Sequence, residues 1–189
     1  MSAKKTSSDC HIISEKPHKN HQLWILMGVS GCGKSAVAQR LSSALNIPSL
    51  DGDFLHPRHN VDKMANGQAL DDDDRLPWLQ ALNQAAYAML RTNPNSLMVC
   101  SALKKNYRDI LRQNNAGIHF IFLSGSKDVV KERLQKRKGH FFKDTMLDSQ
   151  FNTLETPDVD EKDIITVDIN HALDSVVSEC IRQINITNR

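Results

Sequence analysis

The sequence predicts an α/β protein of three layers, in which a parallel β-sheet lies between two layers of helices. Short apolar runs, typical of strands buried on both faces, alternate along the chain with longer segments whose apolar residues repeat at helical spacing. Strands joined in this way are connected by right-handed crossovers, which make the sheet parallel. The chain has 189 residues, of which 40% are hydrophobic and 24% charged, and this is enough for one compact domain with its own core.

The N-terminal part of the chain shows where the domain begins. Residues 1–21 are polar and rich in Ser, Lys and His, so we expect a flexible extension there and a single domain over 22–189. The continuous apolar run at 23–27 predicts the first strand, and a glycine-rich turn follows it. Valine and leucine then recur every four residues, which predicts a helix over 36–45.

The alternation of strands and helices continues to the end of the chain. An amphipathic stripe predicts a long helix over 74–89, with Pro77 tolerated in its first turn. Apolar residues at i, i+3 and i+4 spacing predict a last helix from Leu173 onward. The other expected elements are strands at 47–50, 97–100, 118–123 and 164–169 and helices at 104–113 and 128–138.

The charge balance and the cysteines exclude several classes of protein. Lys and Arg total 24 and Asp and Glu 22, and the net charge of +2 is too small for a dedicated nucleic-acid binder. The longest apolar run, 24–29, is far shorter than the roughly 20 residues of a membrane span. The four cysteines show no C-x-x-C pair and no zinc-ligand spacing, and the N-terminus lacks an apolar secretory segment. We therefore expect a cytoplasmic protein with reduced thiols and no membrane or nucleic-acid partner.

A phosphate-binding motif follows the first strand directly. Residues 28–35 read GVSGCGKS, which fits G-x-x-x-x-G-K-[ST] between a strand and a helix. Such a loop cradles the phosphates of ATP with backbone N–H groups, while Lys34 reaches the β- and γ-phosphates and the Ser35 hydroxyl binds Mg²⁺. The alternative is an accidental match, which should arise in under roughly 1% of chains this long. The residues expected to bind the nucleotide are Gly28, Val29, Ser30, Gly31, Cys32, Gly33, Lys34 and Ser35.

Two acids after the second strand can supply carboxylates to this site. The third strand ends in Ser101 and not in the aspartate of a usual Walker B motif, and the [NT]-K-x-D signature of GTPases is missing. Asp51 and Asp53 follow the strand at 47–50, and the carboxyl ends of parallel strands face the ligand crevice. We expect Asp51 to hold Mg²⁺ and Asp53 to take the proton of an acceptor hydroxyl as the catalytic base. The alternative is a polar loop in which Asp51 caps a turn.

Polar and charged side chains downstream fit an anionic, hydroxyl-rich acceptor. His56 and Lys63 follow Asp53 closely, and Arg75 lies beside the run of acids at 71–74. Such a run is also typical of a solvated helix N-terminus, and we expect at least two of the four acids to do only that.

Basic residues near position 137 indicate a lid. Arg133 and Arg137 lie four residues apart on one predicted helix face, directly before Gly139. A basic helix that leads into a glycine hinge fits a lid that closes over ATP and excludes water. We expect the lid over about 137–157, with Arg133 at the nucleotide and Arg137 as a catalytic cation at the transferring phosphoryl group. Ordinary helix-surface charge is the alternative.

Five blocks make the chain resemble the small, P-loop, shikimate-kinase-like gluconokinases. The P-loop block is generic, whereas the blocks that contain His-Pro, Asp-Arg-x-Pro-Trp and Cys-Ser-Ala-Leu-Lys are specific. The resemblance covers the chain from about residue 23 to its end and implies a three-layer P-loop kinase fold with a mobile lid. The blocks lie at 28–35, 51–64, 72–79, 100–109 and, for the lid, 139–155.

The resemblance implies ATP-dependent phosphorylation of D-gluconate at its terminal hydroxyl to 6-phosphogluconate, in sugar-acid catabolism, by a homodimer. Gluconate needs cationic anchors, which His56, Lys63, Arg75 and Arg108 could supply, and hydrogen-bonding acids such as Asp53. Which basic residue binds the carboxylate stays open. One alternative is a kinase for another small hydroxylated acid or a nucleoside, and another is a module that binds ATP without turnover.

Overall fold

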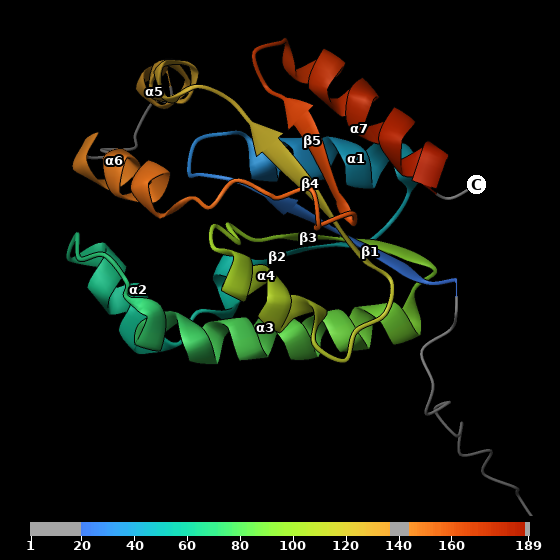
Figure 1. The fold of residues 1–189 in the computed structure, drawn as a ribbon, viewed down its shortest axis with the longest axis horizontal. Helices are drawn as coiled ribbons and strands as arrows, with labels where there is room; N and C mark the ends of the chain where they lie inside the picture. Colours follow the sequence, from blue (N-terminus) through green and yellow to red (C-terminus); the bar gives the residue numbers. More distant parts are fainter. Residues whose placement is uncertain (1–19, 137–143, 188–189) are drawn as a thin grey trace, which may run out of the picture.

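The computed structural model describes residues 20–136 and 144–187, and in this part of the chain five parallel strands form one sheet in the order β2-β3-β1-β4-β5 (Figure 1). In chain order the elements are β1 (Gln22–Met27), α1 (Lys34–Leu45), β2 (Ser49–Asp51), the 3₁₀ helix η1 (Gly52–Leu55), α2 (Arg58–Ala65), α3 (Asp72–Thr92), β3 (Asn95–Val99), α4 (Lys105–Arg112), β4 (Ile118–Ser124), α5 (Lys127–Lys136), α6 (Asp144–Thr153), β5 (Ile164–Asp168) and α7 (Leu173–Thr187).

Helices cover both faces of the sheet, which confirms the prediction of three layers (Figure 1). α1 and α7 lie on one face, and α3 and α4 lie on the other. The central strand β1 contributes alternate side chains to the two cores, with Trp24 and Leu26 on the α1 side and Ile25 and Met27 on the α3 side. All four side chains are fully buried, so β1 is a rigid base for the loop that follows it.

The predicted strands are all present, with ends that differ by at most two residues. The predicted helices are present too, and α3 begins earlier than expected, at Asp72, because Asp71 caps it. The Asp71 carboxylate accepts from the Asp74 N–H at 2.8 Å, and the Asp74 carboxylate accepts from the Asp71 N–H at 3.0 Å. This capping box accounts for two of the four acids at 71–74, Asp71 and Asp74, as expected for a helix N-terminus. The sequence pattern did not predict η1, α2 or α6, which are short; α2 and α6 are also largely polar.

Two predicted features fall largely outside the described residues. The N-terminal extension expected over 1–21 has only its last two residues described, and the first part of the expected lid, 137–143, is not described. Both stay predictions. α6 lies within the range expected for the lid. Among the described helices, none combines the length and the apolar character that a membrane crossing requires.

Candidate active site

The P-loop connects the carboxyl end of β1 to the first turn of α1. Gly28, Gly31 and Gly33 have φ angles of +136°, +85° and +105°, which residues other than glycine rarely adopt. A Cβ atom on Gly31 would lie 2.6 Å from Cγ of Leu134, so this glycine also allows α5 to pack against the loop. Lys34 curls back over the loop and donates to the carbonyl oxygens of Gly28 at 2.9 Å and Val29 at 3.0 Å. The loop thus has the backbone conformation of an anion cradle.

Ser35 and Asp51 come together beside this cradle. The Ser35 hydroxyl donates to Oδ2 of Asp51 at 3.2 Å, and the other carboxylate oxygen accepts from the backbone N–H of Asp53 at 3.1 Å. A hydroxyl and a carboxylate fit Mg²⁺, which takes one or two such ligands and completes its shell with phosphate oxygens and water. No group of three or more His, Cys, Asp or Glu side chains suited to a metal occurs in the described ranges. The residues present therefore fit a metal bound together with nucleotide phosphates.

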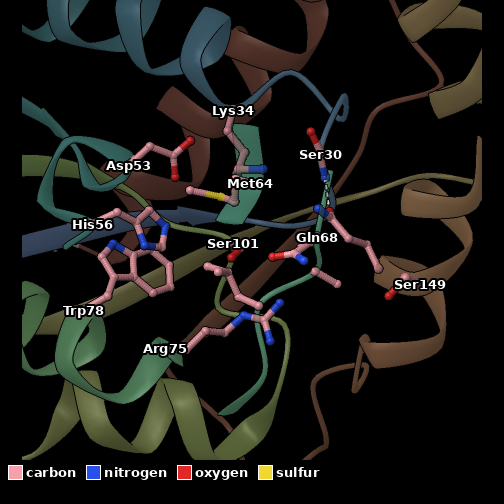
Figure 2. A pocket seen from close by; sticks show the side chains of 13 residues that line it. Ser30, Lys34, Asp53, His56, Met64, Gln68, Arg75, Trp78, Ser101 and Ser149 are labelled. Carbon is pink, nitrogen blue, oxygen red and sulfur yellow. Dashed lines mark hydrogen bonds between the residues drawn. The ribbon is translucent and has the colours of Figure 1, made fainter. Parts of the chain in front are cut away.

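A cavity of about 230 Å³ opens next to the P-loop (Figure 2). Segments far apart in the sequence form its wall: the P-loop, η1, α2 and the turn after it, α3, the start of the β3–α4 connection, and α6. Both polar groups and apolar surfaces face it, which suits a small, polar ligand. The lining residues are Ser30, Lys34, Asp53, His56, Met64, Gln68, Ala69, Leu70, Arg75, Trp78, Ser101, Ser149 and Gln150.

Asp53 is the carboxylate in the cavity wall. Its side chain is exposed toward the open cleft, yet the protein encloses it on the other sides. This burial raises the pKa of Asp53 above its usual value, and the negative charge of Asp51 adds to the effect, while Lys34 opposes it. A carboxylate with a raised pKa beside a phosphate cradle is well suited to accept a proton.

His56 stacks on the indole of Trp78, with ring centroids 4.2 Å apart and planes 13° from parallel. The Trp78 N–H in turn donates to the Gly52 carbonyl oxygen at 2.8 Å, which ties the stack to the acidic turn at 51–53. Burial lowers the pKa of His56 to about 4, and the nearby positive charge of Arg75 contributes. The expectation that His56 supplies a cation is therefore wrong, because the ring is neutral at physiological pH.

The low pKa of His56 predicts a loss of stability in mild acid. Because the unfolded histidine binds its proton at a higher pH than the folded one, the free energy of unfolding should fall as pH drops from 6.5 toward 4. We expect this group to remove on the order of 2 kcal/mol between pH 7 and pH 4.5. Denaturant unfolding at both pH values should show a smaller loss in His56→Gln than in the wild type. His59→Gln changes an exposed histidine on α2 and should behave as the wild type; equal acid losses in all three proteins would contradict the assignment.

Arg75 enters the cavity from α3, whereas Lys34 and Asp53 enter from the side of the P-loop (Figure 2). Its guanidinium carbon lies 5.9 Å from the centroid of the Tyr107 ring. No carboxylate in the described part of the chain forms an ion pair with it. Its charge thus stays available for an anionic ligand.

Two of the four predicted substrate anchors do not line the cavity. Lys63 forms an ion pair with the Asp74 carboxylate, at 2.8 and 2.6 Å from its two oxygens. Arg108 is 1% exposed and donates to the Glu161 carboxylate at 2.8 and 2.6 Å. The prediction for Arg108 is wrong because only the start of the β3–α4 connection, at Ser101, reaches the cavity. Arg108 lies further on, within α4, and its side chain is held by Glu161.

Arg133 lies beside the P-loop, in the wall of a larger opening of about 620 Å³ that Gly33, Lys34 and Ser35 also line. It donates to the carbonyl oxygen of Cys32 at 3.1 Å and to those of Ile169 and His171 after β5. These contacts hold α5 and the end of β5 against the phosphate cradle. The predicted catalytic Arg137 lies outside the described residues.

Some cavity residues were not predicted. Trp78 lies three residues after Arg75 on the same face of α3, and helical spacing could have indicated it. Gln150 of α6 accepts a hydrogen bond from the Ser30 N–H at 2.6 Å, a contact across 120 residues. No periodic pattern marks α6, and the sequence places residue 150 only within the expected lid, with no sign of its contact with the P-loop.

The phosphate cradle opens into a separate cavity, with a carboxylate at the junction. Phosphoryl transfer to a small molecule requires this arrangement, which defines a P-loop kinase. The family model described as AAA domain matches residues 25–146. The chain is 58% identical over 165 residues to the thermoresistant gluconokinase of Escherichia coli (strain K12), covering 87% of this chain and 94% of that protein. The chain belongs to the gluconokinase family.

Other relatives agree with this assignment. The thermosensitive gluconokinase of the same E. coli strain is 46% identical over 157 residues, which cover 83% of this chain and 84% of that protein. Among solved structures, a gluconokinase from Sinorhizobium meliloti 1021 superposes with a TM-score of 0.78 at 39% identity, covering 87% of this chain and 92% of that one.

Proposed function

We propose that this protein transfers the γ-phosphoryl group of ATP to the terminal hydroxyl of D-gluconate, giving 6-phosphogluconate and ADP. The observation that carries this function is the placement of Asp53 and Arg75 in one cavity that opens onto the P-loop. One group can take a hydroxyl proton and the other can bind a carboxylate, so the cavity matches a hydroxy acid at both ends. Membership of the gluconokinase family supports the same substrate.

The residues of the P-loop would bind the nucleotide. Backbone N–H groups of 28–35 would surround the phosphates, and Lys34 would turn from the loop carbonyls, which it now contacts, to the β- and γ-phosphate oxygens. Ser35 and Asp51 would hold Mg²⁺, which when bound neutralises charge on these phosphates. Arg133 would sit at the nucleotide side, and we propose Arg137 as a further cation at the transferring group.

Asp53 would orient the acceptor hydroxyl and receive its proton. As the hydroxyl oxygen bonds to the γ-phosphorus, the bond from that phosphorus to the bridging oxygen breaks and ADP leaves with the electron pair. The proton of the hydroxyl passes to the Asp53 carboxylate. Positioning and charge neutralisation supply most of the rate enhancement in such a reaction.

Arg75 would bind the substrate carboxylate. Of the four candidate anchors, Lys63 and Arg108 are held in ion pairs and His56 is neutral, which leaves Arg75. Its position on α3, across the cavity from the P-loop, would place the carboxylate away from the phosphates and the terminal hydroxyl next to them (Figure 2).

We also propose that the enzyme acts in the cytoplasm, in sugar-acid catabolism, as a homodimer with a lid over about 137–157.

Coupled detection of ADP with a panel of sugar acids and neutral polyols tests this function. We expect ADP release that depends on gluconate, and Arg75→Met should raise the KM for gluconate about 10- to 100-fold, since it removes a charge-assisted hydrogen bond. The KM for ATP should change little, and Arg75→Lys should recover part of the affinity. ADP release without dependence on gluconate would reject the function. A selective response to gluconate with an unchanged KM in Arg75→Met would reject only the role of Arg75.

A further inference from the structure

Asn60 is a fully buried polar residue of α2 that contacts the cavity wall from behind. Its side-chain nitrogen Nδ2 donates to the Asp74 backbone carbonyl oxygen at 2.8 Å and lies 3.3 Å from Nδ1 of His56. A carbonyl oxygen can only accept, so the contact with Asp74 fixes which end of the amide faces these two groups. The other end, Oδ1, is buried without a hydrogen-bond partner in the described part of the chain. In this orientation the Oδ1 acceptor stays unpaired, while Nδ2 keeps its contacts with the Asp74 carbonyl oxygen and with Nδ1 of His56.

This orientation determines where His56 carries its proton. An amide nitrogen donates and cannot accept, so the facing Nδ1 atom of His56 must be unprotonated. A neutral imidazole then has its proton on Nε2, the nitrogen left for the cavity that His56 lines. The ring plane is fixed as well, because Trp78 stacks on it and is itself bonded to Gly52.

The charged groups around His56 favour the neutral ring. Arg75 approaches from α3 and opposes a positive charge on the imidazole. Lys34 from the P-loop and Asp53 from η1, which carry opposite charges, share the cavity with it. Within the described residues the hydrogen bond of the ring is to the Asn60 amide, and no carboxylate bonds to it. Asp74, behind Asn60, has its carboxylate bonded to Lys63.

We propose that Asn60 is a positioning residue that fixes His56 as the Nε2–H tautomer, so that His56 offers the acceptor cavity one neutral N–H donor for a substrate hydroxyl oxygen. The proposal builds on the kinase function above. A neutral donor binds a hydroxyl oxygen without attracting a carboxylate as a cation would. Arg75 is then left to bind the carboxylate, and the polyol end is directed to His56 and Asp53. Together they set the direction in which a sugar acid enters the cavity.

Nitrogen NMR on the ¹⁵N-labelled chain, without nucleotide or acceptor, tests this proposal directly. Long-range ¹H–¹⁵N correlation distinguishes the two neutral tautomers from imidazolium, and His56→Gln assigns the signals. In the wild type we expect the Nε2–H tautomer of His56, unchanged from pH 8 to pH 5. The Nδ1–H tautomer, or imidazolium at pH 6, would overturn the proposal. Because no substrate is present, this outcome is independent of whether gluconate is phosphorylated.

Variants of Asn60 separate positioning from general stability. In Asn60→Asp the Nδ2 donor is replaced by an oxygen, so His56 should change to Nδ1–H or become protonated. Asn60→Leu removes the constraint and should give a mixture of tautomers, with kcat/KM for gluconate about tenfold lower and the KM for ATP unchanged. The matched control is Asn115→Leu, which removes another buried amide, bonded to Asn83 and Leu111 away from the cavity. An equal change of tautomer in the control, or none in either folded Asn60 variant, would overturn the proposal.

Discussion

Replacing Asp53 with asparagine is expected to lower kcat about 10²- to 10³-fold, because the acceptor hydroxyl loses the group that orients it and takes its proton. The amide has nearly the same shape, and the Asp53 backbone N–H that donates to Asp51 is retained. The KM values for ATP and gluconate should therefore change only a few-fold. Initial rates from coupled ADP detection, over a matrix of both substrate concentrations, measure all three quantities.

The same substitution should make the substrate-free protein more stable. Burial and the charge of Asp51 raise the pKa of Asp53, which means that the ionised carboxylate is less favourable in the folded state than in the unfolded one. Above the folded-state pKa this difference lowers the free energy of unfolding, so removing the charge should raise Tm at pH 7. Asp73→Asn, which changes an exposed acid in the first turn of α3, serves as the control and should alter neither kcat nor KM. A kcat for Asp53→Asn within a few-fold of the wild type, in a folded protein, would disprove the role of the base.

The fold and the nucleotide site were predictable because their signals are local. Strands buried on both faces must be apolar throughout, so β1 and β4 can be recognised as strands from the sequence without knowing which strands they pair with. The P-loop is contiguous and needs a strand before it and a helix after it, and both are evident from the sequence. α2 and α6 lack such a signal because they are short and largely polar, and tertiary contacts rather than periodicity define their positions.

The acceptor site was less predictable because it depends on partners far apart in the chain. Lys63, Arg75 and Arg108 are all cations in segments near the crevice, and composition does not show which of them binds the substrate. The structure distinguishes them by their contacts: Lys63 meets Asp74 and Arg108 meets Glu161, 53 residues away. Arg75 has no such partner among the described residues. In the same way, the pKa of His56 is low because the fold buries the ring, which stacks on Trp78, and because α3 brings the positive charge of Arg75 near it.

Arg108 is at the centre of a buried network that joins α4 to the segment before β5. Its guanidinium donates to both oxygens of Glu161 and also to the carbonyl oxygens of Ala102, Leu103 and Glu155, at 3.1 to 3.3 Å. Glu161 is buried too and accepts a further bond from Arg112 at 2.9 Å. The hydrogen bond from Arg108 is the main reason why the pKa of Glu161 falls to about 2.

Arg108→Met is therefore expected to lower the free energy of unfolding by about 3 kcal/mol, because it leaves a buried carboxylate short of its main partner. It also removes a donor from the carbonyl oxygens of Ala102, Leu103 and Glu155, of which Leu103 keeps a bond from the Glu155 N–H. Glu161 has a lower pKa folded than unfolded, so its contribution is present above about pH 4.5 and is lost as pH falls toward 2. The variant should lose much of this dependence. Denaturant unfolding at pH 7 and at pH 3 measures both effects.

Two further variants and the kinetics show whether Arg108 acts through the buried network. Arg108→Met combined with Glu161→Leu removes the uncompensated charge and should recover part of the lost stability. Arg40→Met breaks an exposed ion pair with Asp174 and should change stability by less than about 1 kcal/mol. At a temperature where Arg108→Met is fully folded, its KM for gluconate should stay within a few-fold of the wild type, in contrast to Arg75→Met. A stable Arg108→Met with a greatly raised KM would instead return Arg108 to the substrate site.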